Sequence, residues 1–270
     1  MPDRSQHATD DATDNDNDND DRMGTFKAVI YHATTNFRDL FPKGGSLPDD
    51  LYEQLFKGVK RALRRFGVPL VHLSVEGHPG WGDENYVFKG EPEQIVYNRE
   101  LFFAQFLRQQ NRDDVFWLTE PDHRMVQRFP GLADDIDLCL LRRDDDVAIT
   151  PCWKLARSTA APFFEEACSY FDDPEGKHWH GDSSAYIRLW NNMGRPDLED
   201  SPVEYNGMRI ELRPYRDYSE KDSIYVQHWK SHTKSRLLQR SKRQRIRSWI
   251  RQCRDQASAI AQRILRARTD

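Results

Sequence analysis

The sequence predicts an α/β fold in which a mixed, mostly parallel sheet is flanked by helices. Two observations predict it. Short, near-continuous apolar runs alternate along the chain with longer segments whose apolar residues recur at helical spacing, and such alternation is typical of a sheet covered by helices. The chain also has 270 residues, 37% hydrophobic and 31% charged, which is enough for one large domain with a substantial core.

Four apolar runs are the predicted strands. The first has the near-continuous apolar centre Ala28-Val29-Ile30, which suits a strand buried on both faces. The third is bounded by Asp114 and by Glu120-Pro121, which indicates a short central strand. The four predicted strands span residues 26–32, 69–75, 115–119 and 136–141.

Four segments between and after these runs are predicted helices. In the first, Ser46 is an N-cap with Asp49 three residues on, and Gly67 follows the last apolar residue of a stripe that runs from Leu51 to Phe66. The other three span residues 99–110, 160–171 and 183–190. The Gly-rich residues 78–83 lack the lysine of a P-loop, so we expect a flexible lid or substrate loop there.

The two ends of the chain carry opposite charge, although the net charge is only −4. The first 24 residues hold eight Asp against two Arg, and from His228 to the end thirteen Lys or Arg face two Asp. Residues 10–21 contain only Asp, Asn, Thr and Ala, so they should be disordered. We therefore expect an acidic tail over 1–24, the folded domain over 25–235 and a basic amphipathic helical extension over 236–270.

The apolar runs and the cysteines restrict the class of protein. No run approaches the roughly 18 or more apolar residues of a membrane span, and no apolar signal core is present at the N-terminus. The cysteines are widely spaced without a CxxC pair, so they favour reduced, mostly buried thiols over a disulfide framework. These features predict a cytoplasmic protein. The four cysteines are Cys139, Cys152, Cys168 and Cys253.

The triplet Glu120-Pro121-Asp122 follows the third predicted strand. Ligands of parallel α/β sheets bind outside the carboxyl ends of the strands, which is where this triplet lies. Two carboxylates at this spacing can turn toward one cation, and Mg²⁺ or Mn²⁺ prefers oxygen ligands. Such an ion would neutralise a leaving diphosphate. The alternative is an ordinary polar turn after a strand.

A set of motifs between Phe26 and Lys234 resembles, in place and order, those of the GT-A nucleotide-sugar glycosyltransferases. Residues 117–122 resemble the strand that ends in the D-x-D-like metal motif of that family. Asn98-Arg99-Glu100 resembles its basic position facing the donor. The further matches are residues 149–157 with the Phe163-Phe164 helix, the aspartate motif at 179–185, and residues 228–234, which resemble the late H-x-x-G-x-x-K motif of retaining members.

The resemblance implies a GT-A-like sheet and the metal-dependent transfer of a sugar from a nucleoside-diphosphate sugar, in first place a UDP-sugar, to an acceptor hydroxyl. It implies Mn²⁺ or Mg²⁺ held by Asp122, Glu120 and His228, with Asp182 at the sugar and the acceptor. Because Glu120 stands where the family has its first Asp, Asp122 is the surer ligand. The donor contacts that the resemblance implies are His32, Arg99, Trp153 and Lys234.

Several of these residues also have a plain structural interpretation. His228 could be a packed strand-end histidine, and Asp182 could cap the helix that follows it.

His178 and His180 suggest a zinc site, but their spacing lacks the paired ligands of a structural site. Neither Ser158 nor Ser183 lies in a nucleophile-elbow pattern, so a hydrolase triad is not supported. Ser231 replaces the Gly of the late motif, so the backbone there would approach phosphate less closely.

The basic extension fits three partners: nucleic acid, an anionic membrane, or the protein's own domain. Packing on the domain accounts for its apolar stripe. Its dense Lys and Arg would neutralise phosphates, which suggests an acceptor on DNA, such as a hydroxymethylated pyrimidine in viral DNA that is flipped out of the duplex. Attachment to anionic lipid is the rival. A non-catalytic nucleic-acid-binding protein and a nucleotidyltransferase are the alternative functions.

Overall fold

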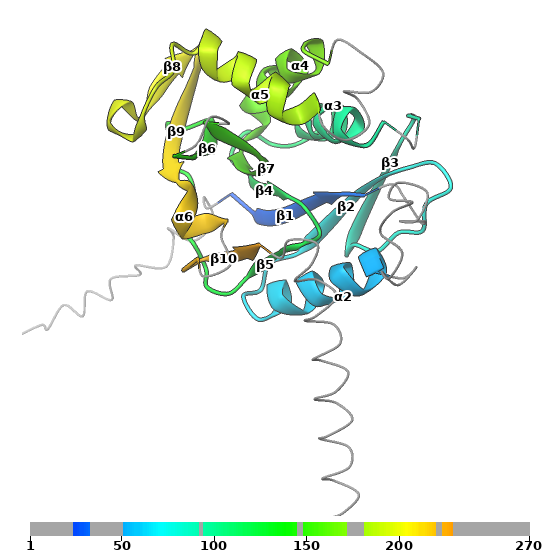
Figure 1. Ribbon diagram of the computed structural model, residues 1–270. Helices are drawn as coiled ribbons and strands as arrows, with labels where there is room; N and C mark the ends of the chain where they lie inside the picture. Colours follow the sequence, from blue (N-terminus) through cyan, green and yellow to red (C-terminus); the bar gives the residue numbers. More distant parts are fainter. Residues whose placement is uncertain are drawn as a thin grey trace, which may run out of the picture.

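The computed structural model shows one large sheet with helices on both faces (Figure 1). Most of the acidic tail, the basic extension, Lys234, and the pair His178 and His180 lie outside the described residues. Among the helices of the described part, none is long and apolar enough to cross a membrane. The described residues are 24–32, 51–91, 94–144, 148–171, 181–219 and 223–228.

Eight strands form the large sheet in the order β3-β2-β1-β4-β7-β6-β9-β8. The pairs β1–β2, β1–β4, β2–β3 and β6–β9 are parallel, whereas β4–β7, β6–β7 and β8–β9 are antiparallel. The predicted mixed, mostly parallel α/β sheet is therefore confirmed. The strands are β1 (Phe26–Tyr31), β2 (Leu70–Val75), β3 (Glu84–Phe88), β4 (Val115–Thr119), β6 (Leu138–Arg142), β7 (Ile149–Ala156), β8 (Val203–Tyr205) and β9 (Met208–Pro214).

Helices cover both faces of this sheet. In Figure 1, α3, α4 and α5 lie on one face, and α2 lies on the other together with a second sheet of two short strands, β5 (His123–Met125) and β10 (Val226–His228). The helices are α2 (Leu51–Arg64), α3 (Ile95–Leu107), α4 (Ala161–Ser169), α5 (Gly181–Asn192) and α6 (Tyr215–Tyr218), with 3-10 turns η2 (Ser158–Ala160) and η4 (Leu198–Asp200).

Side chains that alternate along each central strand fill two separate cores. Val29 and Tyr31 of β1 pack with Phe102 of α3 in the core beneath α3, α4 and α5, whereas Ala28 and Ile30 pack in the core beneath α2. This alternation follows from the two-residue period of a strand. A fully buried Phe contributes about 1.5–3 kcal/mol relative to an exposed one, so the Phe-rich α3 anchors the first core.

Three predicted helices have different ends in the structure. The helix expected over 99–110 begins at Ile95 and ends at Leu107, so Arg99 lies inside its second turn rather than at its start. The helix expected over 183–190 runs from Gly181 to Asn192, which places Asp182 in its first turn. The helix expected over 160–171 is Ala161–Ser169.

The Gly-rich segment after β2 is a packed connection to β3, not the expected flexible lid. A Cβ on Gly82 would lie 2.3 Å from the carbonyl oxygen of Glu84 and 2.8 Å from the backbone nitrogen of His72, so the backbone approaches β2 more closely than any other residue allows. The backbone N–H of Trp81 also donates to the His72 ring. The segment is therefore fixed on the edge of the sheet.

The small second sheet pairs β5 (His123–Met125) with β10 (Val226–His228). The pairing is antiparallel, with His228 opposite His123. Met125 and Val226 are buried against α2 and β4 in the second core, which holds this small sheet against the large one. The pairing thus carries His228 to the carboxyl end of β4.

Candidate metal centre

Glu120-Pro121-Asp122 forms a turn between β4 and β5. The backbone N–H of His123 donates to the Glu120 carbonyl over 3.1 Å, which closes the turn. Because β1 and β4 are parallel neighbours, the end of β1 at His32 lies at the same edge of the sheet. The predicted position of the triplet at a carboxyl edge is therefore confirmed.

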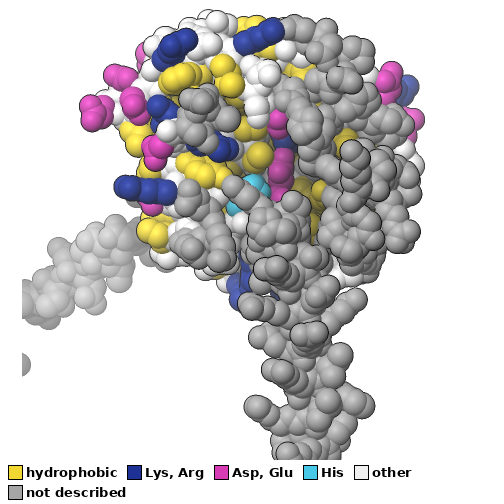
Figure 2. All heavy atoms as spheres, viewed as in Figure 1, with side chains coloured by type: hydrophobic (Ala, Val, Ile, Leu, Met, Phe, Trp, Pro, Cys, Tyr) yellow, Lys and Arg dark blue, Asp and Glu magenta, His cyan; other side chains and the backbone are white. Residues whose placement is uncertain are grey.

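Four side chains converge at this turn: Glu120, Asp122, His123 and His228. Each offers one ligand atom, and these atoms all lie within 4.8 Å of one another. Asp122 is 6% exposed and His123 is fully buried, so the cluster is largely shielded from water. On the face drawn in Figure 2, histidine and acidic side chains lie next to each other near the centre.

The two imidazoles face the same carboxylate. His123 Nδ1 lies 3.4 Å from Asp122 Oδ1, and His228 Nε2 lies 3.5 Å from Asp122 Oδ2. The two rings stack with their centroids 4.3 Å apart and their planes 21° from parallel. Asp122 is therefore the carboxylate that both imidazoles face.

The arrangement fits a divalent cation. Ions with bonds of about 2.0–2.2 Å hold opposite ligand atoms at most about 4.4 Å apart, so small side-chain shifts would close the observed cluster around one ion. Burial raises the pKa of Glu120, and the nearby Asp122 raises it further, although Arg99 acts against both. A cation between the two carboxylates would remove this repulsion.

Arg99 of α3 connects the cluster to α5. Its Nη1 lies 2.5 Å from Glu120 Oε1 and its Nη2 lies 3.1 Å from Asp182 Oδ2, while its Nε contacts Glu100 over 2.8 Å. Burial alone would lower the pKa of Arg99, but the three carboxylates hold it well above its usual value. Asp182 also accepts from the backbone N–H of Ser183 over 2.7 Å.

The buried ion pair of Glu100 with Lys154 contacts Arg99 through Glu100. Lys154 of β7 contacts Glu100 over 3.0 Å, both side chains are fully buried, and the Tyr186 hydroxyl donates to Glu100 over 2.8 Å. Burial lowers the pKa of Lys154 to about 8, although Glu100 acts to raise it. The pKa of Glu100 is lowered, because Lys154 and Arg99 outweigh the effect of its burial. Arg99 is thus held on one side by Glu100 while it reaches Glu120 and Asp182 on the other.

The remaining predicted donor contacts lie in two different places. His32 stacks on Tyr52 with ring centroids 4.2 Å apart. His32 directly follows β1, whose end pairs with the end of β4. Burial raises the pKa of Tyr52, and the negative charges of Asp122 and Glu120 raise it further. Trp153 is fully buried and packs on Tyr218 with ring centroids 5.2 Å apart, within the second core.

The structure therefore brings Glu120, Asp122, His228, Arg99 and Asp182 together, with His32 nearby, whereas Trp153 is fully buried in the second core. Sequence reasoning missed His123, whose Nε2 lies 2.9 Å from Ser219 Oγ, and the Glu100–Lys154 pair. The position of His123 directly after the predicted carboxylates was a signal that could have identified it.

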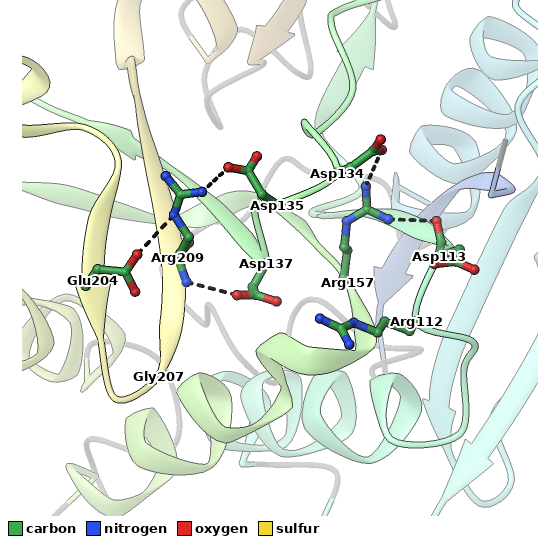
Figure 3. A pocket seen from close by; sticks show the side chains of 9 residues that line it. All are labelled: Arg112, Asp113, Asp134, Asp135, Asp137, Arg157, Glu204, Gly207 and Arg209. Atoms are coloured by element: carbon green, nitrogen blue, oxygen red, sulfur yellow. Dashed lines mark hydrogen bonds and ion pairs between the residues drawn. The ribbon is translucent and has the colours of Figure 1, made fainter. Parts of the chain in front are cut away.

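A second polar site lies at the opposite, amino edge of the sheet (Figure 3). This pocket of about 360 Å³ has acidic and arginine side chains in its lining, which come from the segments before β4 and β6, the end of β7 and the β8–β9 hairpin. Its Arg209 pairs with Asp135 and Glu204, and Arg157 pairs with Asp134. No histidine lines this pocket among the described residues, and its five acidic side chains face three arginines.

Comparisons with known proteins give a likeness of fold at low sequence identity. Neither a protein-family model nor a curated protein sequence matches the chain. A glycosyltransferase involved in the glycosylation of the major capsid of PBCV-1 shares 10% identity, covers 78% of this chain and 98% of its own, and has a TM-score of 0.49. A protein from Desulfovibrio desulfuricans G20, provisionally described as a nucleotide-diphospho-sugar transferase, shares 10% identity over 71% of this chain and 80% of its own, with a TM-score of 0.42. At these values neither likeness assigns a reaction or a substrate to this chain.

Proposed function

We propose that this chain is a metal-dependent glycosyltransferase of the GT-A type, which moves a sugar from a nucleoside-diphosphate sugar to an acceptor hydroxyl. One observation carries the proposal: Glu120, Asp122 and His228 converge at the carboxyl end of β4, and Arg99 ties them to Asp182. The motif order in the sequence anticipated this meeting of residues from four separate segments. A packed polar turn would not need two carboxylates beside two imidazoles.

The side chains divide into two groups with different tasks. Mn²⁺ or Mg²⁺ would be held by Asp122, Glu120 and His228, and it would neutralise the charge that develops on the departing diphosphate. Arg99 is engaged by carboxylates through all three of its nitrogens, so its task in this proposal is to orient Glu120 and Asp182.

Asp182 is the proposed residue at the sugar. During transfer the bond between the anomeric carbon and the diphosphate oxygen breaks, and a bond from the acceptor oxygen to that carbon forms. Positive charge develops at the sugar, and a carboxylate nearby stabilises it. Asp182 lies at the start of α5 with its side chain partly open to solvent, and Arg99 and the Ser183 N–H fix its direction.

The test is a donor screen. Purified protein with Mn²⁺ is incubated with a panel of UDP-, GDP- and dTDP-sugars, and release of the nucleoside diphosphate is measured with water or added acceptors. We expect release from at least one donor, and a loss of about 100-fold or more in Asp122→Asn, since that variant removes the central ligand. Asp135→Asn at the opposite edge is the matched control. Equal rates in Asp122→Asn and wild type would refute the proposal.

Two further measurements, one with a nucleoside triphosphate and a sugar phosphate and one of stabilisation by UDP with Mn²⁺, test the alternative functions. Release of pyrophosphate from a nucleoside triphosphate and a sugar phosphate would indicate a nucleotidyltransferase, which uses similar carboxylate and metal chemistry. A protein that neither turns over any donor nor is stabilised by UDP with Mn²⁺ would be a binding protein.

The acceptor is proposed to be carried on a polyanion such as DNA. Burial lowers the pKa of Arg124 in β5, and the positive charges of Arg65 and Arg61 lower it further. Phosphates would relieve this repulsion. A gel shift with duplex DNA should weaken steeply with salt, and hydroxymethylated DNA should be glycosylated. Binding without any salt dependence would contradict the polyanion and leave a small-molecule acceptor.

A further inference from the structure

We propose that His123 is a fourth ligand of the metal centre and that Ser219 positions it, so that the site selects transition-metal ions over Mg²⁺. The inference rests on the proposed metal-dependent function and goes beyond it, because it names a ligand set and an ion class. In the sequence, His123 was not among the expected ligands.

The position of His123 follows from backbone pairing. His123 and His228 are opposite each other in the antiparallel pair of β5 with β10, so their side chains leave the small sheet on the same face. The rings stack 4.3 Å apart, and each ring directs a nitrogen toward one oxygen of Asp122. The 3.4 Å between His123 Nδ1 and Asp122 Oδ1 is close to the spacing of about 3.0 Å between adjacent ligands of an ion with bonds near 2.1 Å.

Ser219 fixes the direction of the His123 ring. His123 Nε2 lies 2.9 Å from Ser219 Oγ, and both residues are fully buried. The Ser219 backbone N–H donates to the Tyr215 carbonyl over 3.0 Å, which ties the serine to α6. In the tautomer that metal binding at Nδ1 requires, Nε2–H donates to the serine oxygen and the Nδ1 lone pair points toward Asp122. Metal-bound histidines commonly have such a partner on the second ring nitrogen, where it sets the tautomer and the ring orientation.

The resulting ligand set decides which ion is preferred. Two imidazoles and two carboxylates form a mixed nitrogen and oxygen site, whereas Mg²⁺ favours sites made of oxygen. Affinity of nitrogen-containing sites rises from Mn²⁺ to Co²⁺ along the first transition series. A site with His228 as its only imidazole would discriminate less between transition-metal ions and Mg²⁺. His123 therefore contributes selectivity as well as affinity.

The test is a direct measurement of metal binding by the full chain. Calorimetric titration compares Mg²⁺, Mn²⁺ and Co²⁺, and the visible absorption of bound Co²⁺ reports its ligands. We expect Co²⁺ to bind at least about 10-fold more tightly than Mg²⁺ to the wild type. His123→Asn should lower Co²⁺ affinity by about 10-fold or more, change Mg²⁺ affinity by less than about 3-fold, and alter the Co²⁺ spectrum. His78→Asn, in the packed segment after β2, is the matched control and should change neither.

Ser219→Ala gives a second, milder variant that keeps every ligand. It should lower Co²⁺ affinity by about 10-fold, and Ser219→Thr, which keeps the hydroxyl, should restore it. An unchanged Co²⁺ affinity and spectrum in folded His123→Asn or Ser219→Ala, with binding lost in Asp122→Asn, would overturn the inference and leave the proposed function intact. If no ion binds the wild type and no donor is turned over, the proposed function itself fails.

Discussion

The two edges of the sheet both gather carboxylates, but they use them differently. At the amino edge Arg209 reaches Asp135 and Glu204, and all three side chains are more than a third exposed. At the carboxyl edge Glu120 and Asp122 are largely buried, and imidazoles and one buried guanidinium surround them. Exposed ion pairs contribute little, because water screens each charge, whereas buried charges interact strongly. The convergence of buried ligand atoms, rather than the number of acids, distinguishes the candidate centre.

The largest expected effect comes from removing the arginine of the carboxyl edge. Arg99→Met leaves Glu120 and Asp182 without their buried partner, and breaking buried pairs of this kind costs about 3–5 kcal/mol. The free energy of unfolding is measured by urea denaturation. Arg99→Lys keeps the positive charge but not the planar guanidinium that contacts several carboxylates at once, so it should recover part of the lost unfolding free energy. A cost below about 1 kcal/mol would show that the two edges do not differ as described.

Acid should lower the unfolding free energy of the protein through His72 of β2. Burial lowers the pKa of His72 to about 4, and the ring contacts the His32 carbonyl and the Trp81 N–H. The unfolded chain takes up this proton near pH 6.5 and the folded chain only near pH 4, so stability falls by about 3 kcal/mol as the pH drops through this window. His72→Asn should lose this part of the pH dependence of the unfolding free energy. Identical pH profiles would contradict the assignment.

Metal addition should stabilise the protein through the carboxyl edge of the sheet alone. A ligand at 100 times its dissociation constant stabilises the folded state by about 2.7 kcal/mol, so Mn²⁺ should raise the melting temperature of the wild type and EDTA should reverse the rise. Asp122→Asn should abolish the rise, and Asp135→Asn should preserve it. A rise in melting temperature that survives in Asp122→Asn but not in Asp135→Asn would show that the metal binds at the amino edge.

The smallest effect is expected at the amino edge. Arg209→Ala removes two exposed ion pairs, and such pairs contribute about 1 kcal/mol or less. Urea denaturation should therefore give an unfolding free energy within about 1 kcal/mol of the wild type, and donor turnover should not change. A loss comparable to that of Arg99→Met would mean that the arginines of the pocket in Figure 3 are structural supports.

Much of the sheet could be predicted, because its central strands are continuous apolar runs. The predicted strands at 69–75 and 115–119 are confirmed as β2 and β4. The end of β4 then located Glu120 and Asp122, since ligands of parallel sheets bind at carboxyl edges. Their binding of metal stays a prediction.

The missed strands have physical reasons. Lys154 interrupts the apolar pattern of β7 with a charge, which its buried pairing with Glu100 of α3 stabilises. The strands β5 and β10 have three residues each, which is too short for any periodicity. The position of His123 opposite His228 depends on this long-range pairing, so no local signal could place the two rings together.

The pairing of β5 with β10 also has a consequence for the order in which the protein matures. Three of the four converging side chains belong to the turn after β4 and emerge together during synthesis, but His228 leaves the ribosome only after β6, β7, α4, α5 and β9. Until β10 docks on β5, one of the four side chains of the candidate centre is missing from the cluster. The four side chains therefore come together only in a chain whose large sheet has already been translated.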